Sequence, residues 1–161
     1  APNYGGADPR WWGVGLIVAV MLTITLLSVV VLAAPASAGN PQLRICQSGE
    51  RNTPTKTCVV DGDTLWLNGV DYRLKDFDTP EPTTDICGGQ AEVALAHKAS
   101  ARLLELLNAN QWTIETFGLD ETRRRTLATI RIGGRDVGDI LIDQHLARRW
   151  PGGEEWWCAK P

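Results

Sequence analysis

Beyond residue 57, the spacing of apolar and polar residues changes several times between a strand pattern and a helix pattern. Two turn sequences, Asp61-Gly62 and Asn68-Gly69, separate short runs rich in Val, Leu and Trp, and Asn-Gly is a strong hairpin signal. Residues 90–108 follow a three–four apolar spacing from Ala91 onward and predict a helix; residues 137–146 predict a shorter one. The expected strands are residues 58–60, 63–67, 70–74, 111–117 and 126–132.

This order of elements predicts an α+β domain dominated by a small five-stranded OB-type β-barrel with two flanking helices. Three strands, a helix, two further strands and a second helix follow one another along the chain. A barrel of this type is a frequent scaffold for binding nucleic acids and oligosaccharides. Residues 76–89 are rich in Pro, Gly, Asp and Thr and predict a loop between the third strand and the first helix.

The N-terminal part of the chain has a different pattern, because residues 13–34 contain no charged residue. At roughly 1.5 Å per residue, such a stretch is long enough to span the ~30 Å hydrocarbon core of a bilayer. Ala36-Ser37-Ala38 follows, which is the small-residue pattern of a signal-peptidase site. A retained membrane anchor and a cleaved signal are both compatible with this sequence. We therefore divide the chain into an N-terminal segment, a transmembrane or signal helix, a linker and a folded domain: residues 1–12, 13–34, 35–45 and 46–161.

All four cysteines, Cys46, Cys58, Cys87 and Cys158, lie beyond the apolar stretch. An even number there favours disulfides in an oxidising compartment, and the lack of Cys-x-x-Cys spacing gives a zinc site little support. Of the three possible connectivities, we predict Cys46–Cys58, which closes a short polar segment, and Cys87–Cys158, which ties the predicted loop to the C-terminal tail.

Two features disagree about the side of the membrane on which the domain lies. Arg44 and Arg51 follow the apolar stretch, whereas Arg10 is the only basic residue before it, and this bias favours a cytoplasmic domain. The cysteines and the cleavage-like site favour export, and we give them more weight. The protein is then expected to be exported, either membrane-anchored with its domain outside the cytoplasm or secreted or periplasmic after cleavage.

Composition and charge narrow the class of function. The chain has 43% hydrophobic and 22% charged residues, as globular proteins do, and a net charge of −3. A general nucleic-acid-binding protein usually has a basic face, so this charge argues against one. It leaves open an enzyme that meets phosphate through a metal ion and a few placed arginines.

The candidate chemistry lies on both sides of the Asn68-Gly69 turn. The predicted hairpin brings Asp63 and Asp78 near each other, and two carboxylates offer hard oxygen ligands suited to Ca²⁺ or Mg²⁺. Glu81 lies three residues after Asp78, and Arg73 lies five before it. Phosphodiester hydrolysis requires a metal, a carboxylate base and a guanidinium around one cleft, because water must lose a proton and the charge growing on the phosphate must be neutralised.

Taken singly, each of these residues has a commoner structural explanation. An Asp in such a loop usually hydrogen-bonds its own backbone turn, and Arg73 alone is most often a surface strand residue. The run Arg123-Arg124-Arg125 is typical of a solvated basic turn, and His97 and His145 are more often helix-surface residues than ligands or catalysts. The joint spacing of the acidic and basic residues is what favours a catalytic site.

These residues resemble the signature of the staphylococcal nuclease (thermonuclease) family in order and spacing. Val59-Val60-Asp61-Gly62-Asp63-Thr64 is followed by Arg73-x4-Asp78-Thr79-Pro80-Glu81. Further on, Arg125-Thr126-Leu127-Ala128 is similar to the family's Gly-Arg-x-Leu-Ala strand, and residues 137–147 are similar to its helix that ends in Gly-Leu-Ala. The resemblance covers about residues 58–149.

The resemblance implies a monomeric, Ca²⁺-dependent nuclease that hydrolyses DNA, RNA or both. Asp63, Asp78 and the backbone carbonyl of Thr79 would hold the ion, with Asp61 in a supporting role.

The resemblance also implies the catalytic residues. Glu81 would activate or orient the attacking water, and Arg73 and Arg125 would bind the phosphate and stabilise the pentacoordinate transition state. The family breaks the bond to the 5′ oxygen and leaves 3′-phosphate ends.

The sequence departs from the family at several positions. Arg124 precedes Arg125 where the family commonly has Gly, so Arg123 or Arg124 could substitute for it, and Arg124 joins the nucleic-acid-binding candidates. His145 takes a family Gly position near a helix end, where His tolerates a left-handed conformation better than most residues. Trp150 alone is placed to stack on a base, because the family's tyrosines after that helix have no counterpart. A Pro-, Gly- and Trp-rich tail replaces the family's final helix.

Two other functions stay open at this stage. A catalytically idle OB-type module would bind nucleic acid or a protein partner, and a metal-dependent phosphodiesterase would act on a small nucleotide. The nuclease is preferred to the idle module because every catalytic position carries the expected residue type.

Overall fold

The computed structural model describes residues 39–84 and 87–158. They form an α+β domain with two helices and a mixed sheet, which confirms the predicted fold class at this level. Among these residues no helix is both long and apolar enough to cross a membrane, and the helix predicted over residues 13–34 lies outside them. The elements are β1 (Cys58–Val59), β2 (Thr64–Leu67), β3 (Val70–Leu74), β4 (Phe77–Asp78), α1 (Gly89–Ala109), β5 (Trp112–Leu119), β6 (Thr126–Ile132), β7 (Arg135–Asp136), α2 (Val137–Asp143) and β8 (Arg148–Arg149).

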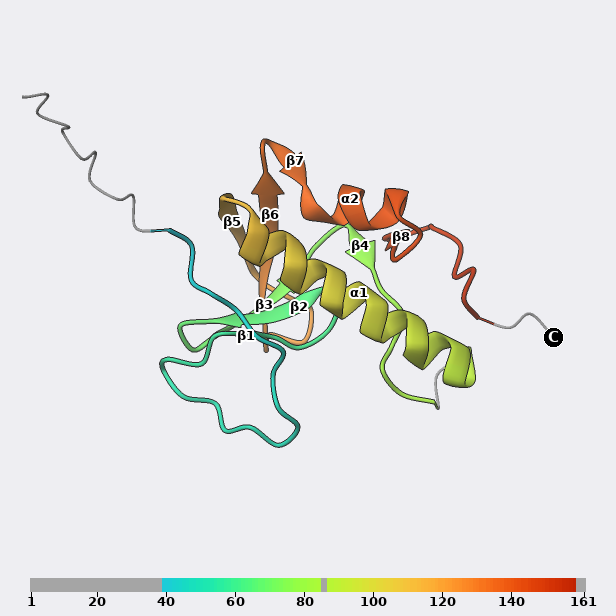
Figure 1. Cartoon of the computed structure of the whole chain (residues 1–161), viewed down its shortest axis with the longest axis horizontal. Coiled ribbons are helices and arrows are strands. Elements are labelled where there is room, and N and C mark those ends of the chain that lie inside the picture. The colour runs from blue at the N-terminus through green and yellow to red at the C-terminus, as the bar shows by residue number, and fades with distance from the viewer. Residues whose placement is uncertain (1–38, 85–86, 159–161) are drawn as a thin grey trace, which may run out of the picture. The chain divides into compact units, whose positions relative to one another are not determined.

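The main sheet has six strands in the order β1-β2-β3-β6-β5, with β7 paired to β6 (Figure 1). Strands β1, β2 and β3 form antiparallel ladders around the turns that the sequence predicted. The β3–β6 ladder is parallel and sets Arg73 opposite Leu127. This pairing brings the strand that carries Arg73 beside the start of β6, directly after Arg125.

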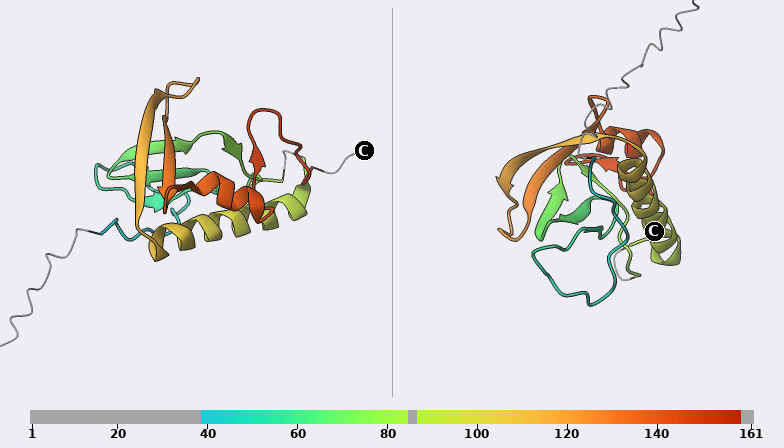
Figure 2. Two further views of the ribbon diagram at one scale, coloured as in Figure 1. Left: turned by 90° about the horizontal axis from the view of Figure 1, so that it is seen from above. Right: turned by 60° about the vertical axis from the view of Figure 1, so that its left-hand side comes forward.

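The sheet is not the closed barrel that the sequence predicted. Within the described residues no ladder joins β1 to β5, the two ends of the strand order. The edge of β1 is covered by residues 44–46, because Cys46 N donates to Val59 O at 2.8 Å and Val59 N donates to Arg44 O at 2.8 Å. At the other end, β5 projects together with β6 (Figure 2). Phe117 and Leu119 of β5 are exposed, so the end of this strand does not pack against β1 to close a core.

The core lies between the strands and α1, which runs along one side of the sheet (Figures 1 and 2). Its fully buried large side chains include Leu65, Leu74, Leu103, Ile130 and Leu141, from both helices and three strands. Burying one such side chain stabilises the fold by about 1.5–3 kcal/mol.

Helix α1 has the predicted extent to within one residue at each end, but its buried face differs from the predicted one in the first turns. Ala91 is exposed, whereas the buried face runs through Ala96, Ala99 and Leu103 and begins with Glu92. The prediction searched for apolar residues at helical spacing, so it could not identify Glu92, a buried acid, as the first residue of this face.

Two short strands that the sequence did not predict pair with each other. Strand β4 lies within the loop predicted over residues 76–89, and its antiparallel ladder with β8 sets Asp78 opposite Arg148. Next to this ladder, Trp150 N donates to Asp76 O at 3.1 Å. Strands of two residues are too short to show a period of two, so no pattern could reveal them. The ladder draws the C-terminal segment onto the loop that carries Asp78.

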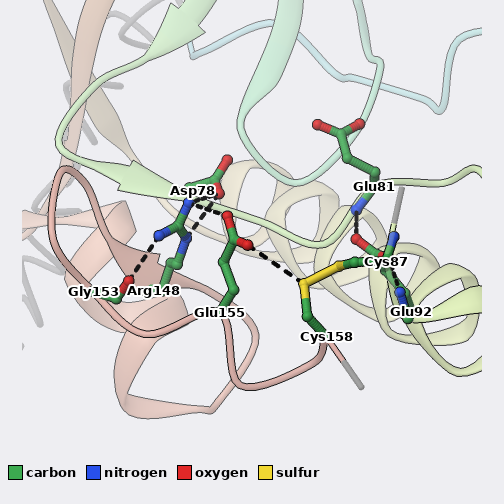
Figure 3. The surroundings of a disulfide bond; sticks show 9 residues. Asp78, Glu81, Cys87, Glu92, Arg148, Gly153, Glu155 and Cys158 are labelled. Carbon is green, nitrogen blue, oxygen red and sulfur yellow. Dashed lines mark hydrogen bonds and ion pairs between the residues drawn. A yellow bond between two sulfur atoms is a disulfide. The ribbon is translucent and has the colours of Figure 1, made fainter. Parts of the chain in front are cut away.

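Both predicted disulfides are confirmed. The Cα atoms are 5.0 Å apart in Cys46–Cys58 and 4.9 Å apart in Cys87–Cys158, an ordinary separation for bridged cysteines. The second bridge ties the tail to the residues just before α1 (Figure 3). His145 has a φ of 55°, the left-handed conformation expected at this glycine-like position.

The folded unit begins before residue 46, the predicted start of the domain. Leu43 is buried, and its backbone N–H and carbonyl both bond to the Asn108 side chain, at 2.8 and 3.0 Å. The Asn40 side chain forms the same kind of pair with the Trp112 backbone, at 2.9 and 3.0 Å. The second half of the predicted linker therefore packs against α1 and β5.

Candidate active site

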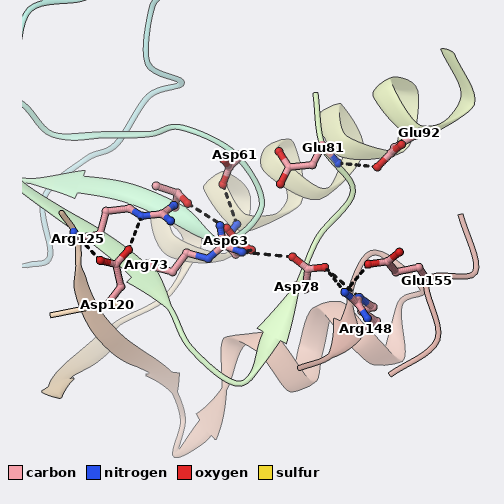
Figure 4. Close-up of polar contacts among 11 residues, drawn as sticks. Asp61, Asp63, Arg73, Asp78, Glu81, Glu92, Asp120, Arg125, Arg148 and Glu155 are labelled. Atoms are coloured by element: carbon pink, nitrogen blue, oxygen red, sulfur yellow. Dashed lines mark hydrogen bonds and ion pairs between the residues drawn. The ribbon is translucent and has the colours of Figure 1, made fainter. Parts of the chain in front are cut away.

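Arg73 joins the two carboxylates predicted to hold a metal ion. Its Nη2 lies 3.0 Å from Asp63 Oδ2 and 3.3 Å from Asp78 Oδ1 (Figure 4). The Asp63 side chain is only 3% exposed, whereas that of Arg73 is 26% exposed. The convergence expected from the hairpin is therefore present, and it is centred on a guanidinium that solvent can reach.

The turn Asp61-Gly62-Asp63 packs directly against Thr79. A Cβ on Gly62 would lie 2.6–2.8 Å from three atoms of the Thr79 side chain, so this approach requires glycine. Inside the turn, Asp63 N donates to Asp61 Oδ1 at 3.1 Å, and Thr64 Oγ1 donates to Asp63 Oδ1 at 3.0 Å. Asp61 thus supports the turn that presents Asp63.

Burial and a surplus of acidic groups set the electrostatics of the site. Burial raises the pKa of Asp63 well above its ordinary value, and the charges of Asp61 and Asp78 raise it further against the lowering effect of Arg73. The pKa of Glu81 is also raised, first by burial and then by Asp61. The acids outnumber the arginines that pair with them, which favours the binding of a cation.

Arg148 belongs to this site, although the sequence did not predict it. Its Nε donates to Asp78 Oδ2 at 2.9 Å, its Nη1 to Gly153 O at 2.7 Å and its Nη2 to Glu155 Oε1 at 2.5 Å. The side chain is only 9% exposed, and its guanidinium lies 5.0 Å from the ring centre of Trp150. An arginine 70 residues away from its partner has no spacing signal, so only the β4–β8 ladder reveals it.

A pocket of about 340 Å³ is lined by both predicted phosphate-binding arginines, Arg73 and Arg125, and adjoins the two carboxylates through Arg73. Trp150 also lines it and is 54% exposed. Asp120 orients Arg125, whose Nε donates to Asp120 Oδ2 at 3.1 Å. The pocket thus combines two guanidinium groups and one accessible aromatic ring with three acids, Asp76, Asp120 and Glu121.

Asp120 is a fixed anion in the wall of this pocket. Burial acts to raise its pKa, but hydrogen bonds from Thr122 Oγ1 at 2.8 Å and from the N–H groups of Arg124 and Arg125 at 3.0 and 3.3 Å outweigh burial and hold the pKa well below its usual range. The Arg124 side chain is exposed and, unlike Arg125, does not line the pocket.

Glu81 lies outside this pocket. It lines a smaller neighbouring pocket of about 210 Å³ together with Asp78 and Thr79. Its carboxylate points toward Asp61 (Figure 4). Trp150 lines both pockets, so the two groups of predicted site residues adjoin at this side chain.

The donor set at Asp63 and Asp78 fits a hard cation. Their carboxylates both approach the Arg73 guanidinium, and carboxylate oxygens are donors that Ca²⁺ prefers. In the described part of the chain, metal-ligating side chains gather in threes only at the two disulfides, where the sulfurs are bonded to each other and cannot act as thiolates. These two groups are Cys46, Glu50 and Cys58, and Cys87, Glu155 and Cys158.

No protein-family model matches the chain, and no curated protein matches it. The assignment of function therefore depends on the site residues and their geometry.

Proposed function

We propose that this protein is a Ca²⁺-dependent nuclease of the staphylococcal nuclease type, which hydrolyses phosphodiester bonds of DNA, RNA or both. The observation that carries the proposal is the meeting of Asp63 and Asp78 at Arg73 Nη2, beside a pocket that Arg125 also lines. We further infer that the sheet and α1 form an open variant of an OB-type barrel. We also infer that the domain is exported, because its two disulfides are compatible with an oxidising compartment.

The pocket supplies what a nucleotide needs. Arg73 and Arg125 offer guanidinium forks, which match the oxygens of a phosphate in a bidentate manner. Trp150 offers an accessible ring, and stacking of a base on an aromatic side chain stabilises binding by about 1–3 kcal/mol. Few charged groups are needed for this, so the acidic net charge of −3 is no obstacle.

Asp63, Asp78 and the Thr79 carbonyl would hold Ca²⁺ beside the phosphate. When bound, the ion would supply positive charge that neutralises the phosphate and lowers the pKa of a nearby water.

The chain's own residues would then perform the hydrolysis. Glu81 takes a proton from the attacking water while the water oxygen bonds to phosphorus. The bond from phosphorus to the 5′ oxygen breaks, and the 5′ oxygen takes a proton from solvent. Arg73 and Arg125 bind the equatorial oxygens more strongly as negative charge grows on them, which lowers the barrier. Asp120 keeps Arg125 in position through the 3.1 Å ion pair.

The decisive experiment incubates the purified, oxidised full-length chain with plasmid DNA, single-stranded DNA and RNA, with Ca²⁺ or with EDTA. Cleavage that requires Ca²⁺ and falls about 10²–10⁴-fold in Glu81→Gln supports the nuclease. The matched control is Glu115→Gln, which changes an exposed acid on β5 and should cleave like the wild type. Binding without cleavage would identify an idle module instead, and hydrolysis of small nucleotide diesters alone would identify a phosphodiesterase.

A further inference from the structure

We infer that Glu92 is a positioning residue for Glu81, an inference that rests on the proposed nuclease function. Glu92 lies in the first turn of α1 and is 1% exposed. One of its oxygens, Oε1, accepts a hydrogen bond from Glu81 N at 3.2 Å. The other, Oε2, accepts from Gly88 N at 2.7 Å and Cys87 N at 3.2 Å. The side chain thus connects the catalytic loop to the N-terminus of the helix (Figure 3).

A buried carboxylate at this place needs a reason, because removing a charge from water is costly unless it is paired or hydrogen-bonded. Three backbone N–H groups surround Glu92, and the N-terminus of a helix favours negative charge. The helix itself has no side-chain cap at Gly88, so Glu92 reaches back to the free N–H groups there, as the acid of a capping box does. The position is therefore built to hold an acid.

Helix capping involves only Oε2 of Glu92. It does not explain the hydrogen bond that Glu81 N donates to Oε1 of Glu92. That bond fixes the backbone of Glu81 two residues beyond Thr79, where a small shift would move the base away from the phosphate. The surrounding packing allows little compensation: a Cβ on Gly88 would lie 2.5 Å from Trp157 O and 2.7 Å from Glu92 Cβ. Glu92 thus sets the position of the Glu81 carboxylate, while the arginines of the neighbouring pocket are untouched.

The test compares Glu92→Ala and Glu92→Gln with Glu105→Gln, an exposed acid of the same helix that pairs with Arg102. Glu92→Ala should lower kcat about ten- to a hundredfold, the size expected when a catalytic group is misplaced by about 1 Å, with KM unchanged within about twofold. Glu92→Gln keeps one acceptor oxygen and should lose less, and Glu105→Gln should lose nothing. A rise in KM at constant kcat would overturn the proposal.

A double-mutant cycle separates positioning from general destabilisation. In a Glu81→Gln background, Glu92→Ala should cost no further activity, because the group it positions no longer acts as a base. If Glu92→Ala lowered activity by the same factor in the wild type and in Glu81→Gln, the inference would be overturned. If Glu92→Ala does not fold, the same cycle is run with Glu92→Gln.

Amide hydrogen exchange provides a readout that does not depend on nuclease activity. The Glu81 amide should exchange faster in Glu92→Ala than in the wild type, and Glu105→Gln should leave its rate unchanged. Unchanged protection of this amide in Glu92→Ala would contradict the inference even if the enzyme is active. Absence of cleavage by the wild type, with exchange as expected, would count against the proposed function alone.

Discussion

Arg148 and Asp78, 70 residues apart in the sequence, lie opposite each other in the β4–β8 ladder and are joined from Nε to Oδ2 at 2.9 Å. The same guanidinium holds the tail at Gly153 and Glu155. One oxygen of Asp78 therefore faces Arg73 and the other faces Arg148. The orientation of a predicted metal ligand depends on the C-terminal segment of the domain.

Replacing Arg148 should therefore weaken Ca²⁺ binding and loosen the tail together. Arg148→Ala removes the arginine partner of Glu155 and one of the two arginine partners of Asp78. It should lower stability by about 3 kcal/mol, the size seen when one member of a buried ion pair is removed. Calorimetry with Ca²⁺ and limited proteolysis of the tail measure the two effects. The control is Arg149→Ala, since that neighbour is exposed and pairs with Asp139 on the surface. Equal effects of the two substitutions would argue against a special role for Arg148.

The carboxylate pair predicts metal dependence directly. Asp63→Ala and Asp78→Ala should each weaken Ca²⁺ binding, because each removes an anionic oxygen from a hard-cation site. Titration calorimetry on the folded variants measures the affinity. Wild-type Ca²⁺ affinity in both variants would contradict the assignment of Asp63, Asp78 and Thr79 as ligands.

Within the basic run, Arg125→Ala should lower the rate more than Arg124→Ala or Arg123→Ala. Arg125 lines the pocket and is held by Asp120, whereas the other two side chains are exposed. A guanidinium fork that loses its contact with phosphate gives up a charge-assisted bidentate bond. Cleavage rates of the three variants decide the order, and a larger loss in Arg124→Ala would shift the phosphate-binding role by one residue.

The lowered pKa of Asp120 predicts a specific pH dependence of stability. A carboxyl group whose pKa is lower in the folded than in the unfolded state, where it is about 3.9, stabilises the fold fully above that value. This contribution is lost as the pH falls below about 4 toward the folded-state pKa. The Tm difference between the wild type and Asp120→Asn should thus be constant from pH 7 to 5 and shrink below pH 4. A difference that grows on acidification would have the wrong sign for this carboxylate.

The two disulfides should differ in their effect on activity. In the chain-entropy treatment, the bridge across 12 residues contributes about 3 kcal/mol and that across 71 residues about 4 kcal/mol. Cys87–Cys158 ends beside Glu92 and Glu155, so Cys87→Ser/Cys158→Ser should lower both Tm and turnover and make the tail protease-sensitive.

The matched control is Cys46→Ser/Cys58→Ser, which should lower Tm while leaving turnover near wild type, because that bridge closes a segment away from the pockets. Melting curves, turnover and peptide mapping under non-reducing conditions measure these effects. Equal turnover losses in the two double variants would mean that the long bridge has no special link to the site.

The local features of this protein could be predicted from its sequence. Asn68-Gly69 specified the β2–β3 hairpin, and a two-residue turn fixes the register of the two strands that it joins. The position of Asp63 before this hairpin and of Asp78 after it therefore predicted that the two acids lie near Arg73. The extent of α1 followed from its spacing, and the cysteine pairing from the lengths of the segments that the bridges close.

The contacts between distant segments could not be predicted, because they depend on how the whole domain folds. Whether the sheet closes depends on what covers the edge of β1, and residues 44–46 occupy it through hydrogen bonds that carry no sequence signal. Arg148 reaches Asp78 through a ladder too short to have a period, and Glu92 is buried where a helical pattern expects an apolar side chain. Such polar contacts depend on where a partner lies in space, and local spacing has no information about that.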